Sequence, residues 1–131
     1  MALIPSPEGG TLTKLTDFGT KFEAILVQTD EGREEEYRGH NRHRAKTAII
    51  GRAWDVFLPD GTFVGVLTYD MVTHERHSGR NTYVDARWRT PGWCYRHAAA
   101  DGTRGTGHRY NTTGKGAAVR RLIENRKGFT L

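Results

Sequence analysis

Arginines, histidines and aromatic residues gather in a few short stretches of this sequence, and their side chains are the ones best suited to chemistry. The first stretch runs from Tyr37 to Lys46 and holds four cations: Arg38, Arg42, Arg44 and Lys46. Guanidinium groups bind phosphate oxygens, and each phosphate neutralised adds salt-dependent affinity for a nucleic acid. The alternative is a solvated arm, balanced by the three glutamates that precede it.

A second group alternates along residues 82–97. In a strand over residues 82–89, three apolar side chains are expected to face the core: Val84, Ala86 and Trp88. The opposite face then presents Tyr83, Arg87 and Arg89. Aromatic rings stack on exposed bases while arginines hold the backbone, as in sheet-type readers of single strands. The alternative is cross-strand packing of tyrosines, with arginines lying over them.

A third group lies where the glycine-rich segment 102–116 leads into a predicted helix. Glycines let backbone N–H groups approach an anion, and a helix N-terminus carries a partial positive charge. Lys115 lies at this point, and Arg120 and Arg121 follow on the helix. We expect the three cations to contact phosphates, the alternative being an ordinary capped helix.

Histidine and cysteine pairs suggest a metal site only weakly. Three pairs have zinc-like spacing: His40 and His43, His74 and His77, and Cys94 and His97. Structural zinc sites usually use more cysteine than the one present, so we expect no metal and no other cofactor. Cys94 is expected to be a small buried hydrophobe.

Catalysis is a weaker hypothesis than binding. Two histidines and nearby arginines can cleave RNA without metal, and two sets of residues are candidates: His74 and His77 with Arg76, or His97 with His108. No serine triad, cysteine–histidine motif or pair of carboxylates stands out. We therefore predict no catalytic residues.

The charge is divided between the two parts of the chain. The chain has 20 bases and 15 acids. Residues 1–36 hold three of the bases and eight of the acids, a net charge of −5, and residues 37–131 hold the remaining 17 bases and seven acids, a net charge of +10. This asymmetry indicates an anionic partner, nucleic acid first, and also permits self-association. The sequence has no apolar run long enough for a membrane helix and no signal-peptide pattern, and it has a single cysteine. We therefore expect a cytoplasmic protein.

The elements that must position these groups are mostly strands. Residues 1–10 are expected to form a flexible tail, and residues 11–131 a single basic domain. Residues 11–29 fit either an amphipathic helix or, as we favour, a strand. Residues 30–46 are expected to form an exposed hairpin or loop. The clearest signal is a β-hairpin over residues 53–69 that turns at Pro59–Gly61.

The remaining elements follow from turn and helix signals. Residues 78–81 mark a turn, and Pro91–Gly92 marks another between strands over residues 82–89 and 93–97. Residues 98–114 are expected to form a mobile loop, and a helix capped by Thr112 or Thr113 is expected to run to about Asn125. The predicted fold is α+β, an antiparallel meander packed against one C-terminal helix.

Together these patterns predict a small basic nucleic-acid-binding accessory protein, of a phage or mobile element. The alternative is a protein-interaction module, an inhibitor or adaptor of a host complex that uses the acidic N-terminal segment and arginine hot spots. A small metal-independent RNase is the third hypothesis.

Overall fold

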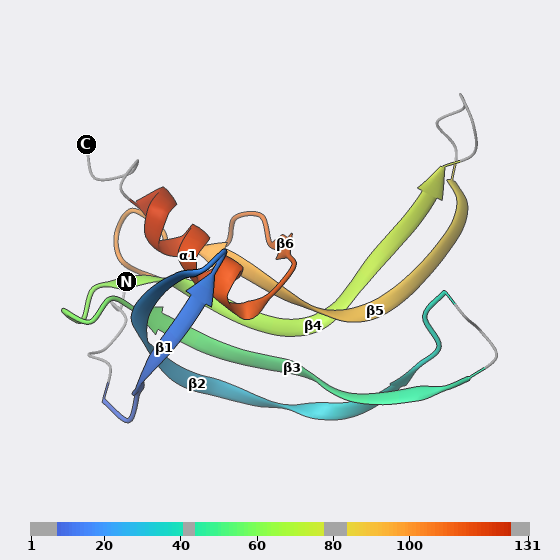
Figure 1. Cartoon of the computed structure of the whole chain (residues 1–131), viewed down its shortest axis with the longest axis horizontal. Helices are drawn as coiled ribbons and strands as arrows, with labels where there is room; N and C mark the ends of the chain where they lie inside the picture. The colour runs from blue at the N-terminus through green and yellow to red at the C-terminus, as the bar shows by residue number, and fades with distance from the viewer. Residues whose placement is uncertain (1–7, 41–43, 78–83, 127–131) are drawn as a thin grey trace.

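In the described part of the chain, one six-stranded antiparallel sheet and one helix make up the fold (Figure 1). The computed structural model describes residues 8–40, 44–77 and 84–126. In chain order its elements are β1 (Thr11–Asp17), β2 (Thr20–Tyr37), β3 (Lys46–Phe57), β4 (Phe63–His77), β5 (Val84–His97), β6 (Tyr110–Thr112) and α1 (Lys115–Arg126). The strands pair in sequence order from β1 to β6. The predicted α+β meander with a C-terminal helix is therefore confirmed.

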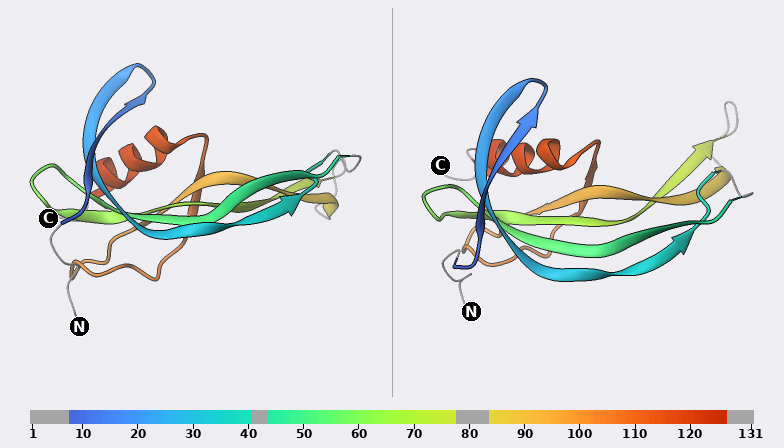
Figure 2. Two further views of the ribbon diagram at one scale, coloured as in Figure 1. Left: turned by 90° about the horizontal axis from the view of Figure 1, so that it is seen from below. Right: turned by 60° about the horizontal axis from the view of Figure 1, so that its bottom comes forward.

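The core lies between α1 and one face of the sheet, with the β1–β2 hairpin curling up beside the helix (Figure 2). Val119 and Leu122 of α1 are fully buried against Leu67 of β4 and Tyr95 of β5. Burying a side chain of this size stabilises the fold by about 1.5–3 kcal/mol. The predicted helix is confirmed. It begins at Lys115, later than a cap at Thr112 or Thr113 implies, and the Thr112 side chain bonds to the Gly114 backbone.

The N-terminal segment forms strands, so the helical interpretation of residues 11–29 is wrong. Leu15, Ala24 and Leu26 enter the core with the period of two that strands give. Between β1 and β2 the chain turns at Phe18 and Gly19, both with positive φ, and the Phe18 ring is 94% exposed. The sequence resembles an amphipathic helix here because Phe18, an exposed turn residue, has by chance a helical spacing from the apolar strand residues that follow it. Residues 1–7 of the predicted tail lie outside the described part.

The predicted hairpin over residues 53–69 is confirmed as β3 and β4. Its alternation is interrupted, because the register shifts where Phe57 pairs with Phe63, directly after the Val56–Gly65 pair. Val64 and Leu67 consequently both enter the core, although strict alternation predicts that they lie on opposite faces.

The turn predicted at Pro91–Gly92 is wrong, because β5 continues through it. Pro91 pairs with Met71 and Gly92 with Asp70, in unbroken register from Gly65–His97 to Arg76–Ala86. On the other side of β5, β6 pairs only with Trp93–Tyr95, so the edge is open at Pro91. A proline is tolerated at such an edge because its missing N–H removes no ladder bond.

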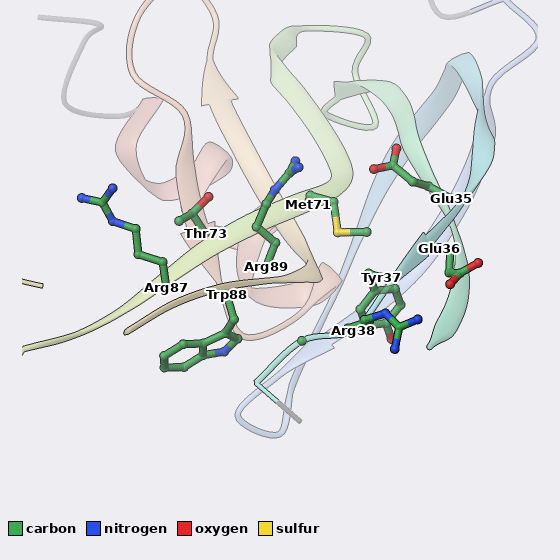
Figure 3. A pocket seen from close by; sticks show the side chains of 10 residues that line it. Glu35, Glu36, Tyr37, Arg38, Met71, Thr73, Arg87, Trp88 and Arg89 are labelled. Atoms are coloured by element: carbon green, nitrogen blue, oxygen red, sulfur yellow. The ribbon is translucent and has the colours of Figure 1, made fainter. Parts of the chain in front are cut away.

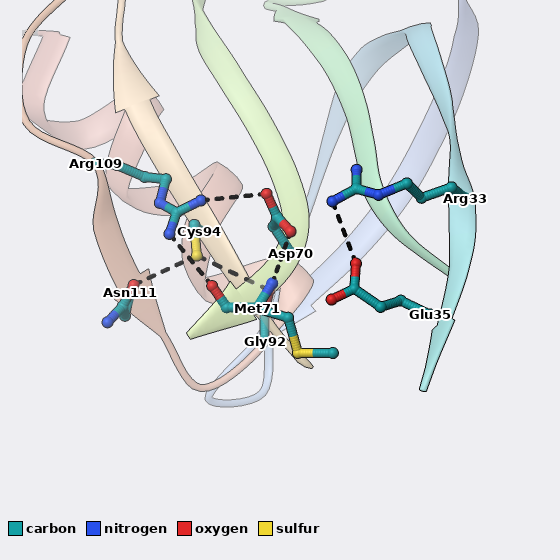
Figure 4. Close-up of polar contacts among 8 residues, drawn as sticks. All are labelled: Arg33, Glu35, Asp70, Met71, Gly92, Cys94, Arg109 and Asn111. Atoms are coloured by element: carbon teal, nitrogen blue, oxygen red, sulfur yellow. Dashed lines mark hydrogen bonds and ion pairs between the residues drawn. The ribbon is translucent and has the colours of Figure 1, made fainter. Parts of the chain in front are cut away.

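The glycine-rich connection after β5 is anchored to the sheet. Arg104 donates to both carboxylate oxygens of the buried Asp55. Arg109 lies 3.5 Å from an Asp70 carboxylate oxygen and donates to the Met71 carbonyl at 3.3 Å (Figure 4). Within the predicted loop, β6 was missed because its three residues carry no alternating pattern.

Two ribbons extend from the helix-covered part of the sheet. β3 and β4 pair only over Arg52–Phe57 and Phe63–Tyr69. Beyond these residues β2 pairs with β3, and β4 with β5, as two separate two-stranded ribbons (Figure 1). The acidic stretch before Tyr37 belongs to the first ribbon, where residues 30–37 of β2 pair with residues 46–53 of β3, and residues 41–43 lie outside the described part. Among the described residues, no helix is both long and apolar enough to span a membrane.

Candidate nucleic-acid interface

One face of the β4–β5 ribbon carries aromatic and basic residues in succession. Because β5 is continuous, its odd-numbered residues from Arg87 to His97 share the face that α1 covers at the Tyr95 end. Going outward from the helix, the cross-strand pairs on this face are Leu67–Tyr95, Tyr69–Trp93, Met71–Pro91, Thr73–Arg89 and Glu75–Arg87. From Trp93 to Arg87 the row spans about 20 Å at the usual strand rise.

The inner part of this row is an aromatic cluster with two cations. The Tyr69 and Trp93 ring centroids lie 4.8 Å apart, and those of Trp54 and Trp93 5.6 Å apart. The Arg52 guanidinium carbon lies 4.7 Å from the Tyr69 centroid, and Lys115 Nζ lies 5.9 Å from the centroids of both tryptophans. Cations over aromatic faces are held by the ring quadrupole. This cluster therefore gives ordered positive charge beside partly exposed rings.

The outer part of the row forms one wall of a pocket of about 510 Å³ between the two ribbons (Figure 3). On one side, β4 contributes Met71 and Thr73 and β5 contributes Arg87 and Arg89. On the other side lie Tyr37, the last residue of β2, and Arg38, which follows it. Three arginines from segments about fifty residues apart in sequence thus surround one pocket.

Trp88 extends from β5 on the side opposite Arg87 and Arg89 (Figure 3). Its ring stacks on His74, with centroids 5.6 Å apart and planes at 17°, and lies 4.5 Å from the His40 ring. Trp88 therefore contacts both β4 and the segment that follows β2, and it lines the pocket between them.

The charges on this face are only partly neutralised. Arg87 forms an ion pair with Glu75 at 3.1 Å. No carboxylate in the described residues lies within ion-pair distance of Arg52, Arg89 or Lys115. The opposite pocket wall carries Glu35 and Glu36, so an anion is favoured on the Arg87–Arg89 side.

We name the basic aromatic face as the set Arg52, Trp54, Tyr69, Arg87, Arg89, Trp93 and Lys115. Of the cations predicted from sequence, Arg87, Arg89 and Lys115 lie on it, and Arg38 lies on the facing pocket wall. Arg44 and Lys46 are exposed near the end of the first ribbon. Arg42 and Tyr83 lie outside the described residues.

The helix arginines lie elsewhere. Arg120 donates to Glu124 at 2.7 Å and lies 3.6 Å from an Asp17 carboxylate oxygen, so it joins α1 to the β1–β2 turn. Arg121 is exposed on α1 and lines none of the pockets described here.

Four members of the basic aromatic face were missed by sequence reasoning: Arg52, Trp54, Tyr69 and Trp93. Arg52 and Trp54 are two residues apart on β3, so they share one face, and Arg52 pairs with Tyr69 of β4. The alternation of the predicted hairpin could therefore have placed Arg52, Trp54 and Tyr69 together. Trp93 could not have been joined to Arg87 and Arg89 while a turn was predicted at Pro91–Gly92.

Four histidines in the described residues form two groups that lie far apart, one beside Trp88 and one beside Tyr110. His74 pairs across from Trp88, and His97 pairs across from Gly65, nine residues or about 30 Å away along β4. His97 and His108 both contact the Tyr110 ring, with centroids 6.0 and 4.8 Å away. Partial burial lowers the pKa of His97.

No metal site emerges within the described residues. They contain no group of three or more metal-ligating side chains close enough to hold an ion. Cys94 and His97 lie on opposite faces of β5, so this pair cannot ligate one metal. The Cys94 thiol is fully buried and donates to Asn111 Oδ1 at 3.3 Å (Figure 4), and burial raises its pKa. The buried role predicted for Cys94 is confirmed.

The chain matches no protein-family model, no curated protein and no solved structure.

Proposed function

We propose that this protein binds single-stranded nucleic acid along the basic aromatic face. Bases stack on the partly exposed rings of Tyr69 and Trp93, while Arg89, Arg52 and Lys115 contact the phosphates. Stacking on aromatic side chains contributes about 1–3 kcal/mol per base and tolerates any sequence. The arginines on this face suit phosphate oxygens because of their planar donor fork.

The observation that supports this proposal best is the continuity of β5. Because the strand runs through Pro91 and Gly92, rings and cations share one face over about 20 Å. That length is adequate for several extended nucleotides but short for a duplex groove. The curled sheet beside the inter-ribbon pocket favours a flexible strand over a rigid duplex.

The test is a binding titration with nucleic-acid-free protein and labelled single-stranded DNA, single-stranded RNA and duplex DNA of one length. We expect micromolar or tighter binding to a single strand, weaker binding to the duplex, and a log affinity that falls linearly with log salt concentration. Affinity that is indifferent to salt, or a preference for duplex, would count against the proposal.

A protein-interaction role is the second candidate, and the exposed Phe18 favours it. A phenylalanine that is 94% exposed, in a left-handed backbone conformation at a hairpin end, is unusual for a residue without a partner. Capture of one stoichiometric protein after nuclease treatment, abolished by Phe18→Ser and retained by Lys21→Ser in the same hairpin, is the expected result for this role.

A further inference from the structure

A second pocket lies on the face of the sheet opposite α1, under the connection between β5 and β6. Its volume is about 290 Å³. The lining residues are Val66, Thr68, Arg96, Arg104, Gly105 and Arg109. Three of these six are arginines, and none of them belongs to the basic aromatic face. The pocket is therefore separate from the proposed nucleic-acid interface.

Two of the three arginines are fixed by carboxylates. Arg104 forms a two-pronged ion pair with the buried Asp55, and Arg109 pairs with Asp70 and the Met71 carbonyl (Figure 4). The hydrogen bond to Asp55 raises the pKa of Arg104 further above its ordinary value. These contacts hold the connection against the sheet and keep two guanidinium groups in place around the pocket.

The third arginine has no such partner. Arg96 lies on β5 across from Val66, and its Nε is buried without a hydrogen bond. Within the described residues, no carboxylate lies within ion-pair distance of its guanidinium group. A buried donor without an acceptor is destabilising by about 1–3 kcal/mol in general.

The Thr68 hydroxyl, which lines the same pocket, also lacks a strong hydrogen-bond partner. Thr68 Oγ1 is buried without a hydrogen bond to any oxygen or nitrogen atom, and only the weakly accepting sulfur of Cys94, its cross-strand neighbour, lies beside it. Around this pocket three guanidinium groups face two carboxylates, those of Asp55 and Asp70. One positive charge and two buried polar atoms are thus left for a ligand to satisfy.

We propose that this pocket binds a small phosphate-bearing anion. A phosphate group supplies several acceptor oxygens for Arg96, accepts the Thr68 hydroxyl proton in a hydrogen bond and balances the remaining charge. Arg104 and Arg109 are already held in place by their ion pairs, so they do not have to be ordered on binding. At about 290 Å³ the pocket lies at the lower limit of small-molecule sites, which favours free phosphate or a small phosphate ester.

The experiment is a titration of the whole chain with inorganic phosphate and, separately, with glycerol 3-phosphate, followed by amide chemical shifts at constant ionic strength. Saturable binding is expected, with shifts at Thr68 and Arg96. Tighter binding of the ester identifies an organic phosphate as the ligand, and equal binding identifies free phosphate. An absence of saturation up to about 10 mM of either probe would overturn the proposal.

Matched variants make the test specific. Arg96→Gln and the nearly isosteric Thr68→Val are each expected to weaken binding at least tenfold, whereas Arg121→Gln on α1 removes the same charge as Arg96→Gln and leaves binding unchanged. Affinity equal to wild type in both pocket variants would refute the site. Because Arg87→Gln/Arg89→Gln alters only the opposite face, it separates this result from a failure of nucleic-acid binding.

Discussion

Individual side chains in this protein separate into those that hold the fold and those that are available to a ligand. Arg104, Arg109 and Arg120 are engaged by carboxylates, and they join the β5–β6 connection and α1 to the rest of the chain. Arg52, Arg89 and Lys115 carry charge that no described carboxylate neutralises. Net charge alone does not make this distinction, because it counts both groups equally.

Cys94 should be unreactive in the folded protein. Its side chain is fully buried, and burial raises the pKa of the thiol, so the thiolate that reacts with alkylating agents is scarce near neutral pH. We expect iodoacetamide at pH 8 to modify the native protein far more slowly than the urea-unfolded protein. Equal rates measured by mass spectrometry would show that the thiol is accessible.

His97 should make stability depend on pH. Burial lowers its pKa below the ordinary 6.5, so the unfolded chain binds more protons than the folded chain once the pH falls through 6.5. The contribution of His97 to stability is therefore complete above pH 6.5 and decreases as the solution is acidified. NMR titration should give a His97 pKa below 6.5, and His97→Gln should flatten the acid side of the stability curve. A measured pKa above 6.5 would contradict the structure.

At the scale of elements, the helix and the long strands decide where the functional side chains lie. α1 approaches the sheet so closely at Gly116 that a Cβ atom there would clash with the Thr16 carbonyl oxygen of β1. This contact brings Lys115, one residue earlier, over the rings of Trp54 and Trp93. The position of α1 on the sheet therefore determines the position of Lys115 in the aromatic cluster.

Gly116→Ala tests this link. The added methyl group should destabilise the protein by about 1–2 kcal/mol, since overpacking of about 1–3 kcal/mol outweighs a gain in helix propensity of up to about 1 kcal/mol. Gly107→Ala is the control, because a Cβ there meets no atom within 4 Å, and it should change stability by less than about 0.5 kcal/mol. Urea unfolding of the two variants gives the comparison. Equal effects would indicate that α1 can move away from β1 freely.

The elements also show what the sequence could predict. Local signals were sufficient for the β3–β4 hairpin and for α1, because turn residues and apolar periodicity identify both. They failed at Pro91–Gly92, where only the open edge of β5 shows that a proline is tolerated. They also failed for Arg52 and Trp93, whose proximity depends on strand register rather than on distance in sequence. Arg87 and Arg89 were placed together correctly because they are two residues apart on one strand.

At the scale of the whole molecule, charge and shape act together. The chain carries its positive excess after Tyr37, and the fold brings part of that excess onto one face of the β4–β5 ribbon. Most of the negative charge of the first part lies on β2, and two of its glutamates line the far wall of the inter-ribbon pocket. The molecule thus has a preferred side for an anionic strand rather than a uniformly basic surface.

The most direct measurement is the salt dependence of single-strand binding by wild type, Arg87→Gln/Arg89→Gln and Lys14→Gln/Lys21→Gln. Both double variants lose two positive charges, but Lys14 and Lys21 are exposed on the β1–β2 hairpin and are not members of the basic aromatic face. Each phosphate contact contributes about 0.7 to the slope of log affinity against log salt concentration. We predict that the slope for the arginine variant is shallower by about 0.7–1.4 and that the slope for the lysine variant equals that of wild type. Equal changes in the two variants would contradict the proposed interface, because they would show that binding responds to net charge alone.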